Sequence, residues 1–138
     1  MNTQANMIVD KMMAKDLFSQ WLGIERLDER EGYCQLKMMV RPEMCNGFGI
    51  AHGGITYSFA DSALAFASNS HGRHAVSIET SISHIRPLLP GDVIIATAEE
   101  QNISNKIGIY EIRVENEHKE LIALFKGTVF RKETLWNV

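Results

Sequence analysis

The densest run of apolar and small side chains follows Gly53-Gly54 and predicts a helix enclosed by the rest of the protein. Residues 55–67 leave almost no polar face, which is the pattern of a helix covered on most sides. One carboxylate, Asp61, interrupts this run. Because an isolated buried carboxylate is costly unless it is paired, hydrogen-bonded or protonated, we expect Asp61 either to be held by hydroxyls such as Ser58 or Ser62 or to be kept for chemistry.

Helical spacing of apolar residues also occurs near the N-terminus, and strand-like segments occupy most of the remaining chain. Residues 8–21 predict an amphipathic helix that ends at Gly23. Six segments bounded by turn residues predict β-strands, at residues 24–29, 33–40, 75–85, 92–103, 107–114 and 121–130. Every second side chain from residue 76 to 82 is apolar or threonine, so we expect that strand to have one apolar face.

The predicted order is a helix, two strands, one long buried helix and four strands. Strands that follow one another through short turns favour an antiparallel sheet, and a single apolar helix needs such a sheet to cover it. The sequence therefore predicts an α+β fold in which an antiparallel β-sheet wraps around one long central α-helix. The 138 residues fit one domain, residues 1–138, and the open edges of so small a sheet favour the pairing of subunits.

Composition narrows the classes of function. Hydrophobic residues make up 45% of the chain and charged residues 22%, values that argue against a disordered or fibrous protein. The formal charge of −3 lacks the basic excess of a nucleic-acid-binding surface, so we expect no nucleic-acid partner. No apolar run approaches a membrane span and the first residues lack the pattern of a signal peptide, which predicts a cytoplasmic protein with no membrane contact.

The histidines and cysteines predict no metal site. The five histidines form no HxH or HxxxH pair on one element, and Cys34 and Cys45 lack the CxxC spacing of metal or redox motifs. Buried thiols and surface imidazoles are the expected roles of these side chains.

The glycines at the start of the central helix are candidates for chemistry. In His52-Gly53-Gly54 the N–H of Gly53 should be among the unpaired donors at the positive end of the helix dipole, where it can polarise a carbonyl group. A tight turn against the sheet is the alternative reason for both glycines. Asp61 follows Gly53 by eight residues, which is about 12 Å along one helix. The two groups can therefore act on one bond only if they come from two subunits.

Asn46 adds an amide to this set. It precedes Gly53 by seven residues and could reach the same carbonyl or a water molecule, although Asn46-Gly47 is equally a turn dipeptide. An amide, a backbone donor at a helix start and a carboxylate are the groups needed to hydrolyse an activated ester without a serine or cysteine nucleophile. The combination favours a hydrolase over a purely structural loop.

The central stretch resembles a known family. The motif is Asn46-Gly47-x-Gly49-x-x-His52-Gly53-Gly54 followed by Ala60-Asp61. It is similar to the hotdog-fold acyl-CoA thioesterases, in particular to the phenylacetic-acid-degradation group. The resemblance implies a hotdog fold, a homodimer with a continuous sheet that doubles into a homotetramer, and active sites at each dimer interface. It implies hydrolysis of an aryl-acyl-CoA, phenylacetyl-like, with coenzyme A as part of the substrate and no other cofactor.

The same resemblance implies roles for individual residues. Asp61 would be the nucleophile or the base that activates water, Gly53 the N–H that polarises the thioester carbonyl, and Asn46 the group that orients water or the leaving sulfur. The remaining substrate-binding positions are the loop residues His52 and Gly54 and a hydroxyl that positions water, Ser77. Because coenzyme A carries phosphates, Arg86, Lys106 and Lys126 are candidate cations to meet them, and a solvated surface charge is the alternative role of each. Candidate walls of the acyl slot are Phe48, Ile50, Tyr57 and Leu64, for which a place in the hydrophobic core is the alternative.

Two other functions remain open at this point. The first is a non-catalytic acyl-CoA binding or sensor protein that uses the same cleft. The second is a dehydratase of the hotdog fold, which uses a histidine together with a helix carboxylate, and His52 could serve as that histidine.

Overall fold

The computed structural model describes residues 2–138. Its elements in chain order are α1 (Gln4–Lys15), α2 (Leu17–Leu22), β1 (Glu25–Arg30), β2 (Tyr33–Met39), a 3-10 turn (Pro42–Met44), α3 (Gly53–Asn69), β3 (Arg73–His84), β4 (Val93–Ile103), β5 (Ile107–Asn116) and β6 (Leu121–Leu135). No helix among them is both long enough and apolar enough to span a lipid bilayer.

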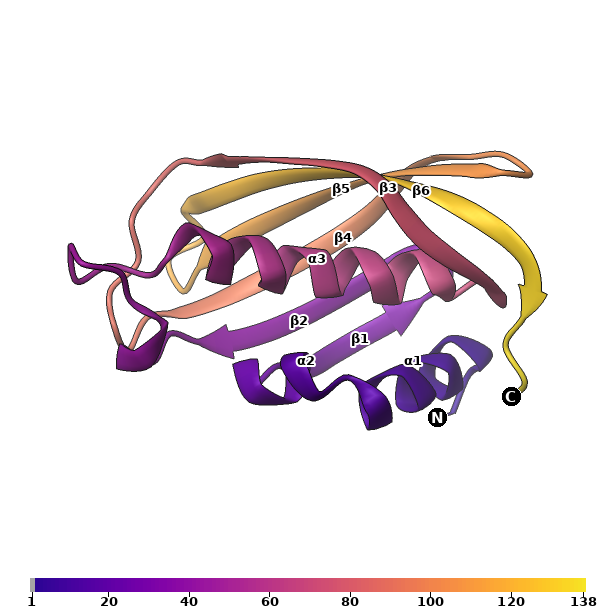
Figure 1. Cartoon of the computed structure of the whole chain (residues 1–138), viewed down its shortest axis with the longest axis horizontal. Helices are drawn as coiled ribbons and strands as arrows, with labels where there is room; N and C mark the ends of the chain where they lie inside the picture. The colour runs from indigo at the N-terminus through magenta and orange to yellow at the C-terminus, as the bar shows by residue number, and fades with distance from the viewer. Residues whose placement is uncertain (1) are drawn as a thin grey trace.

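One antiparallel sheet of six strands curls around α3, in the strand order β1-β2-β4-β5-β6-β3 (Figure 1). The helix contacts every strand of this sheet. The predicted α+β fold, with an antiparallel sheet wrapped around one central helix, is therefore confirmed. Strand β3 occupies one edge and pairs only with β6, so its other edge faces outward within one chain.

The helix α3 is held in place by its large apolar side chains and by a glycine in the sheet. Phe59, Leu64 and Phe66 are buried almost completely against the inner face. A Cβ atom built on Gly127 of β6 would lie 2.5 Å from Cδ2 of Leu64, so only glycine lets the helix approach the sheet this closely. This close packing fixes the position of the helix start relative to the ends of the strands.

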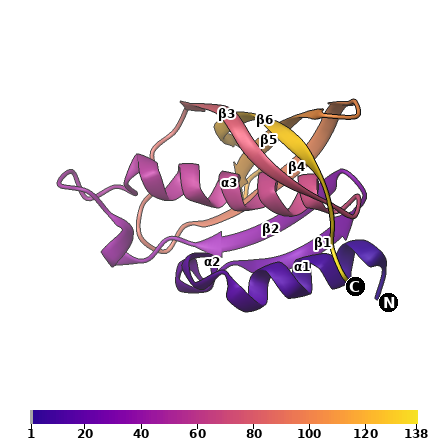
Figure 2. The ribbon, with the colours of Figure 1, turned by 45° about the vertical axis from the view of Figure 1, so that its right-hand side comes forward.

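The predicted N-terminal helix at residues 8–21 is wrong in its extent and continuity. The segment forms two helices, α1 and α2, separated at Asp16, which has a non-helical backbone. The Asp16 carboxylate accepts hydrogen bonds from the backbone N–H of Ser19 at 2.9 Å and from its hydroxyl at 2.6 Å, and so caps α2. Gly23 ends α2 in the left-handed conformation, as predicted. Both helices lie on the opposite side of α3 from β5, and the C-terminal end of β6 curves past α3 toward α1 (Figure 2).

The expectation of one apolar face on the third predicted strand is also wrong. A β-bulge between Ser77 and Glu79 shifts the pairing of β3 with β6. Val76, before the bulge, shares the outer face with Phe130, whereas Ile82, after it, faces α3 with Phe125. Val76 and Ile78 are 46% and 58% exposed in the single chain, so the edge of the sheet carries uncovered apolar side chains.

Candidate active site at the start of the central helix

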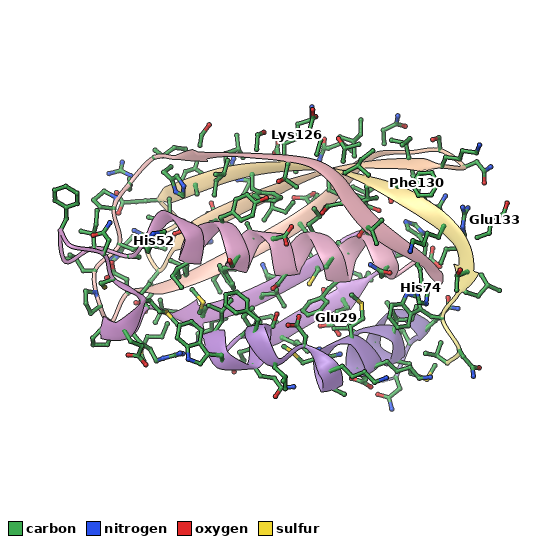
Figure 3. All side chains as sticks on the ribbon, viewed as in Figure 1. Glu29, His52, His74, Lys126, Phe130 and Glu133 are labelled. Carbon is green, nitrogen blue, oxygen red and sulfur yellow. The ribbon has the colours of Figure 1, made fainter. Side chains whose placement is uncertain are left out.

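The first turn of α3 presents a free backbone donor. His52 lies at the start of α3 (Figure 3) and is its N-cap residue. Its Nδ1 accepts a hydrogen bond of 2.8 Å from the N–H of Gly54. Gly53 opens the helix, and within residues 2–138 its N–H donates to no acceptor. The helix dipole makes this position favourable for a negatively polarised oxygen.

The capping bond also defines what His52 and Gly54 can do. The N–H of Gly54 is occupied by His52, so it is not available to a substrate. The role of Gly54 as a substrate-binding residue stays a prediction. His52 supports the loop through Nδ1, which acts as the acceptor. Its ring is exposed, so its other nitrogen faces solvent or a ligand.

Asn46 lies on the other wall of the same cavity. Its Oδ1 accepts the N–H of Phe48 at 2.9 Å, which confirms the turn reading of Asn46-Gly47. The side-chain Nδ2 forms no hydrogen bond within the part of the chain that the structure describes, so the turn holds the amide in place while leaving its donor free. A cavity of about 290 Å³ brings Asn46 and Gly53 together with Thr56 of α3, His84 at the end of β3 and residues 85–88 of the β3–β4 connection.

Asp61 lies in the middle of α3, about half-buried. No hydrogen bond to its carboxylate is formed within residues 2–138, and the hydroxyl of Ser62 bonds instead to that of Ser19 at 2.8 Å. The alternative that hydroxyls such as Ser58 or Ser62 hold this carboxylate is therefore wrong. Burial raises the pKa of Asp61 above its ordinary value, and the negative charge of Asp16 raises it further. The result is a carboxylate that is unpaired and more basic than usual.

Asp61 does not line the cavity that contains Gly53. Both residues belong to one helix, and eight residues of α-helix separate them by about 12 Å. Within one chain the unpaired carboxylate and the free N–H therefore cannot meet at one bond.

Of the other predicted binding residues, Arg86 lines the cavity of Gly53, whereas Ser77 and Lys106 do not. Arg86 forms an exposed ion pair of 3.4 Å with Glu120. Ser77 is exposed on β3 and, because it pairs with the buried Val129, lies on the face of the sheet that turns toward α3. Lys106 lies elsewhere, in a cavity of about 370 Å³ with Arg131, so one chain does not bring it to the helix start.

Of the four predicted walls of the acyl slot, Ile50 alone is among the residues that line the cavity of Gly53. Phe48 is 90% exposed at the tip of the loop. Leu64 belongs to the core, and the hydroxyl of Tyr57 bonds to that of Thr80 while its ring packs on Phe125. Leu64 and Tyr57 do not line the cavity, because the sheet covers the side of the helix on which they lie.

The structure adds Thr56 and His84 to the cavity, and neither was predicted as a site residue. Thr56 could have been found from the sequence, because it lies one turn of helix after His52. His84 gave no such signal, since only the pairing of β3 with β6 brings it to the helix start.

Comparison with known proteins gives concordant matches. The model of the thioesterase superfamily matches residues 48–123. The acyl-coenzyme A thioesterase PaaI of Escherichia coli is 36% identical over 120 residues, which cover 87% of this chain and 86% of that protein. The structure of the E. coli PaaI protein from the phenylacetic acid degradation operon superimposes with a TM-score of 0.93 at 33% identity, covering 96% of both chains. A mutant of phenylacetic acid degradation protein PaaI from Thermus thermophilus has a TM-score of 0.82 at 39% identity, covering 85% of this chain and all of that one.

Proposed function

Because the chain belongs to the thioesterase superfamily, we propose that it hydrolyses an aryl-acyl-CoA, phenylacetyl-CoA or a close analogue, at a site shared by two protomers. The predicted family, hotdog fold and enzyme class, a thioester hydrolase, are confirmed by the matches. The observation that carries the site proposal is the separation on α3 of a free N–H at Gly53 and an unpaired carboxylate at Asp61. The aryl specificity is supported by the two related PaaI structures, whose names refer to phenylacetic acid degradation.

The second protomer docks along the open edge of β3 in this proposal. This strand is twelve residues long, and its outer edge leaves backbone donors and acceptors unpaired within one chain. The exposed side chains of Val76 and Ile78 supply apolar surface along it. Antiparallel pairing of two β3 strands extends the sheet across both protomers and sets the two α3 helices side by side, so that Asp61 of each faces the helix start of the other. The predicted homotetramer requires a second, separate contact between two such dimers.

In the proposed reaction Asp61 is the general base. The thioester carbonyl oxygen accepts the Gly53 N–H, and the amide of Asn46 donates to the substrate from the opposite wall. Asp61 of the other protomer takes a proton from water as the water oxygen bonds to the carbonyl carbon, and the carbonyl electron pair moves to oxygen. The pair then returns, the carbon–sulfur bond breaks, and the coenzyme A thiolate leaves with a carboxylic acid as the other product. Arg86 is placed to meet a phosphate of coenzyme A at the mouth of the cavity.

A panel of acyl-CoA substrates tests the activity directly. Phenylacetyl-CoA, benzoyl-CoA, short and long aliphatic acyl-CoAs and an enoyl-CoA are each incubated with the protein, and released thiol is measured with a thiol reagent. We expect the highest kcat/KM for phenylacetyl-CoA or its ring-hydroxylated analogues. Saturable binding without thiol release would instead indicate a binding protein, and addition of water to the enoyl-CoA without thiol release would indicate a dehydratase.

The charge of Asp16 gives a prediction for the pH profile. Asp61 must be ionised to accept a proton, so activity is lost as pH falls through its pKa. Asp16→Asn removes the negative charge that raises the pKa of Asp61, and the acidic limb of kcat/KM should therefore move to lower pH. Asn keeps a side-chain oxygen for the cap of α2, so the fold should be retained. Asp28→Asn on β1 is the control, and an unmoved limb in the Asp16 variant would contradict the prediction.

A further inference from the structure

His84 is the last residue of β3 and projects toward the start of α3. It pairs with Ala123 of β6, which is fully buried and lies on the same face of the sheet as Phe125. The imidazole therefore lies on the inner side of the sheet, at the open end where the strand leaves the helix. It is exposed in the single chain because the cavity lies next to it.

The ring of His84 lies against Gly53. A Cβ atom built on Gly53 would be 3.2 Å from Nε2 of His84 and 3.4 Å from its Cε1, so the edge of the ring that carries Nε2 is turned toward this glycine. Any side chain at position 53 would press on the imidazole. The contact gives Gly53 a second reason to be glycine, beside the approach of a ligand to its N–H.

Neither group has a partner. The side chain of His84 forms no hydrogen bond or ion pair with any of residues 2–138, and the N–H of Gly53 is likewise unpaired. The two groups line one cavity together with the free amide of Asn46. A loop, a helix start and a strand end thus each bring one nitrogen-bearing group to the same small cavity.

We propose that His84 is a further catalytic residue of the thioester site, whose Nε2–H donates a second hydrogen bond to the carbonyl oxygen held by the Gly53 N–H. This inference rests on the proposed function, which supplies the thioester. Two donors on one oxygen stabilise the negative charge that develops there in the transition state more than the smaller charge of the ground state. His84 therefore acts on kcat more than on KM.

Three variants of His84 and one control test this role. His84→Ala and His84→Phe remove the donor, and we expect each to lower kcat about 100-fold. His84→Gln places an amide N–H near the position of Nε2 and should recover most of the loss. KM should change little in all three variants. Ser83→Ala is the matched control, because Ser83 pairs with Leu124 on the outer face of the same strand and should keep the wild-type rate.

The outcomes separate the two proposals. The assay uses the acyl-CoA that the wild-type protein cleaves fastest, and the thermal melting temperature of each variant reports on folding. An active wild-type protein whose His84→Ala and His84→Phe variants keep their kcat would overturn the role of His84 alone. A loss of rate that Gln does not restore, accompanied by a lower melting temperature, would also overturn it, in favour of a structural role. A wild-type protein that releases no thiol from any substrate would overturn the proposed function itself.

Discussion

Asp61→Asn is expected to lower kcat about a thousandfold while leaving the fold and the association of protomers intact. Asn has nearly the same shape as Asp but accepts no proton from water, so only the base is removed. The carboxylate forms no hydrogen bond within residues 2–138, so the substitution breaks none there. Thiol release measured at saturating substrate gives the change in kcat, and size-exclusion chromatography reports on the oligomer.

The melting temperature of the same variant provides a control on folding. Burial raises the pKa of Asp61 in the folded protein, so its ionised form costs folding free energy. The stabilising contribution of a raised pKa is present at low pH and is lost as the pH rises through the pKa that Asp61 has in the folded protein. At neutral pH the uncharged Asn should therefore melt at the same or a higher temperature. Near-normal kcat in Asp61→Asn would exclude this residue as the base.

Labelled water separates a general base from a nucleophile at Asp61. In a single turnover in ¹⁸O-water, a general base directs the label into the released acid and leaves the Asp61 carboxylate unlabelled. A covalent anhydride that water opens at the Asp61 side would put the label into Asp61 instead. Mass spectrometry of the product and of the peptide that contains Asp61 distinguishes these results.

The fold could be predicted from the sequence wherever the spacing of apolar residues and a residue that ends a helix or strand indicate the same boundary. The apolar run after Gly53-Gly54 predicted α3 at its observed start, and Gly23 ends α2 in the conformation that glycine favours. The break at Asp16 was missed because an aspartate suits both the polar face of a helix and an N-cap. The bulge in β3 was missed because an inserted residue leaves the alternation of apolar and polar residues in the sequence intact. It nevertheless moves the side chains that follow it to the other face of the sheet.

The candidate site was predictable only where its residues lie near one another along the chain. Asn46 and Gly53 border one loop, so sequence spacing alone suggested that they meet. His84 comes from the far end of β3, and its approach to Gly53 follows from strand pairing and from the close packing of α3 on Gly127. Asp61 was found by its polarity in an apolar run, but its lack of partners could be seen only in the structure.

A pair of inactive variants should restore activity when they are combined in one dimer. Asp61→Asn removes the base, and Gly53→Pro removes the N–H that binds the carbonyl oxygen. Proline is favoured at the first position of a helix, and the preceding residue, His52, has φ −60° and ψ 137°, an extended backbone that proline tolerates. The exposed ring of His84 can shift to admit the proline, so both variants should fold. Each homodimer should be inactive, whereas their heterodimer contains one complete site and should show about half of the wild-type activity.

A second heterodimer with the same mutations arranged differently makes the test decisive. A chain that carries both Asp61→Asn and Gly53→Pro is paired with a wild-type chain, and both heterodimers are isolated through two different affinity tags. If each site takes its base from one protomer and its N–H from the other, this second heterodimer has two incomplete sites and is inactive. If each site lies within a single protomer, the outcomes are reversed: the wild-type protomer alone is active, and the pair of single variants releases no thiol. The helical separation of Gly53 and Asp61 on α3 requires the first outcome, because about 12 Å of rigid helix keeps the two groups of one chain apart.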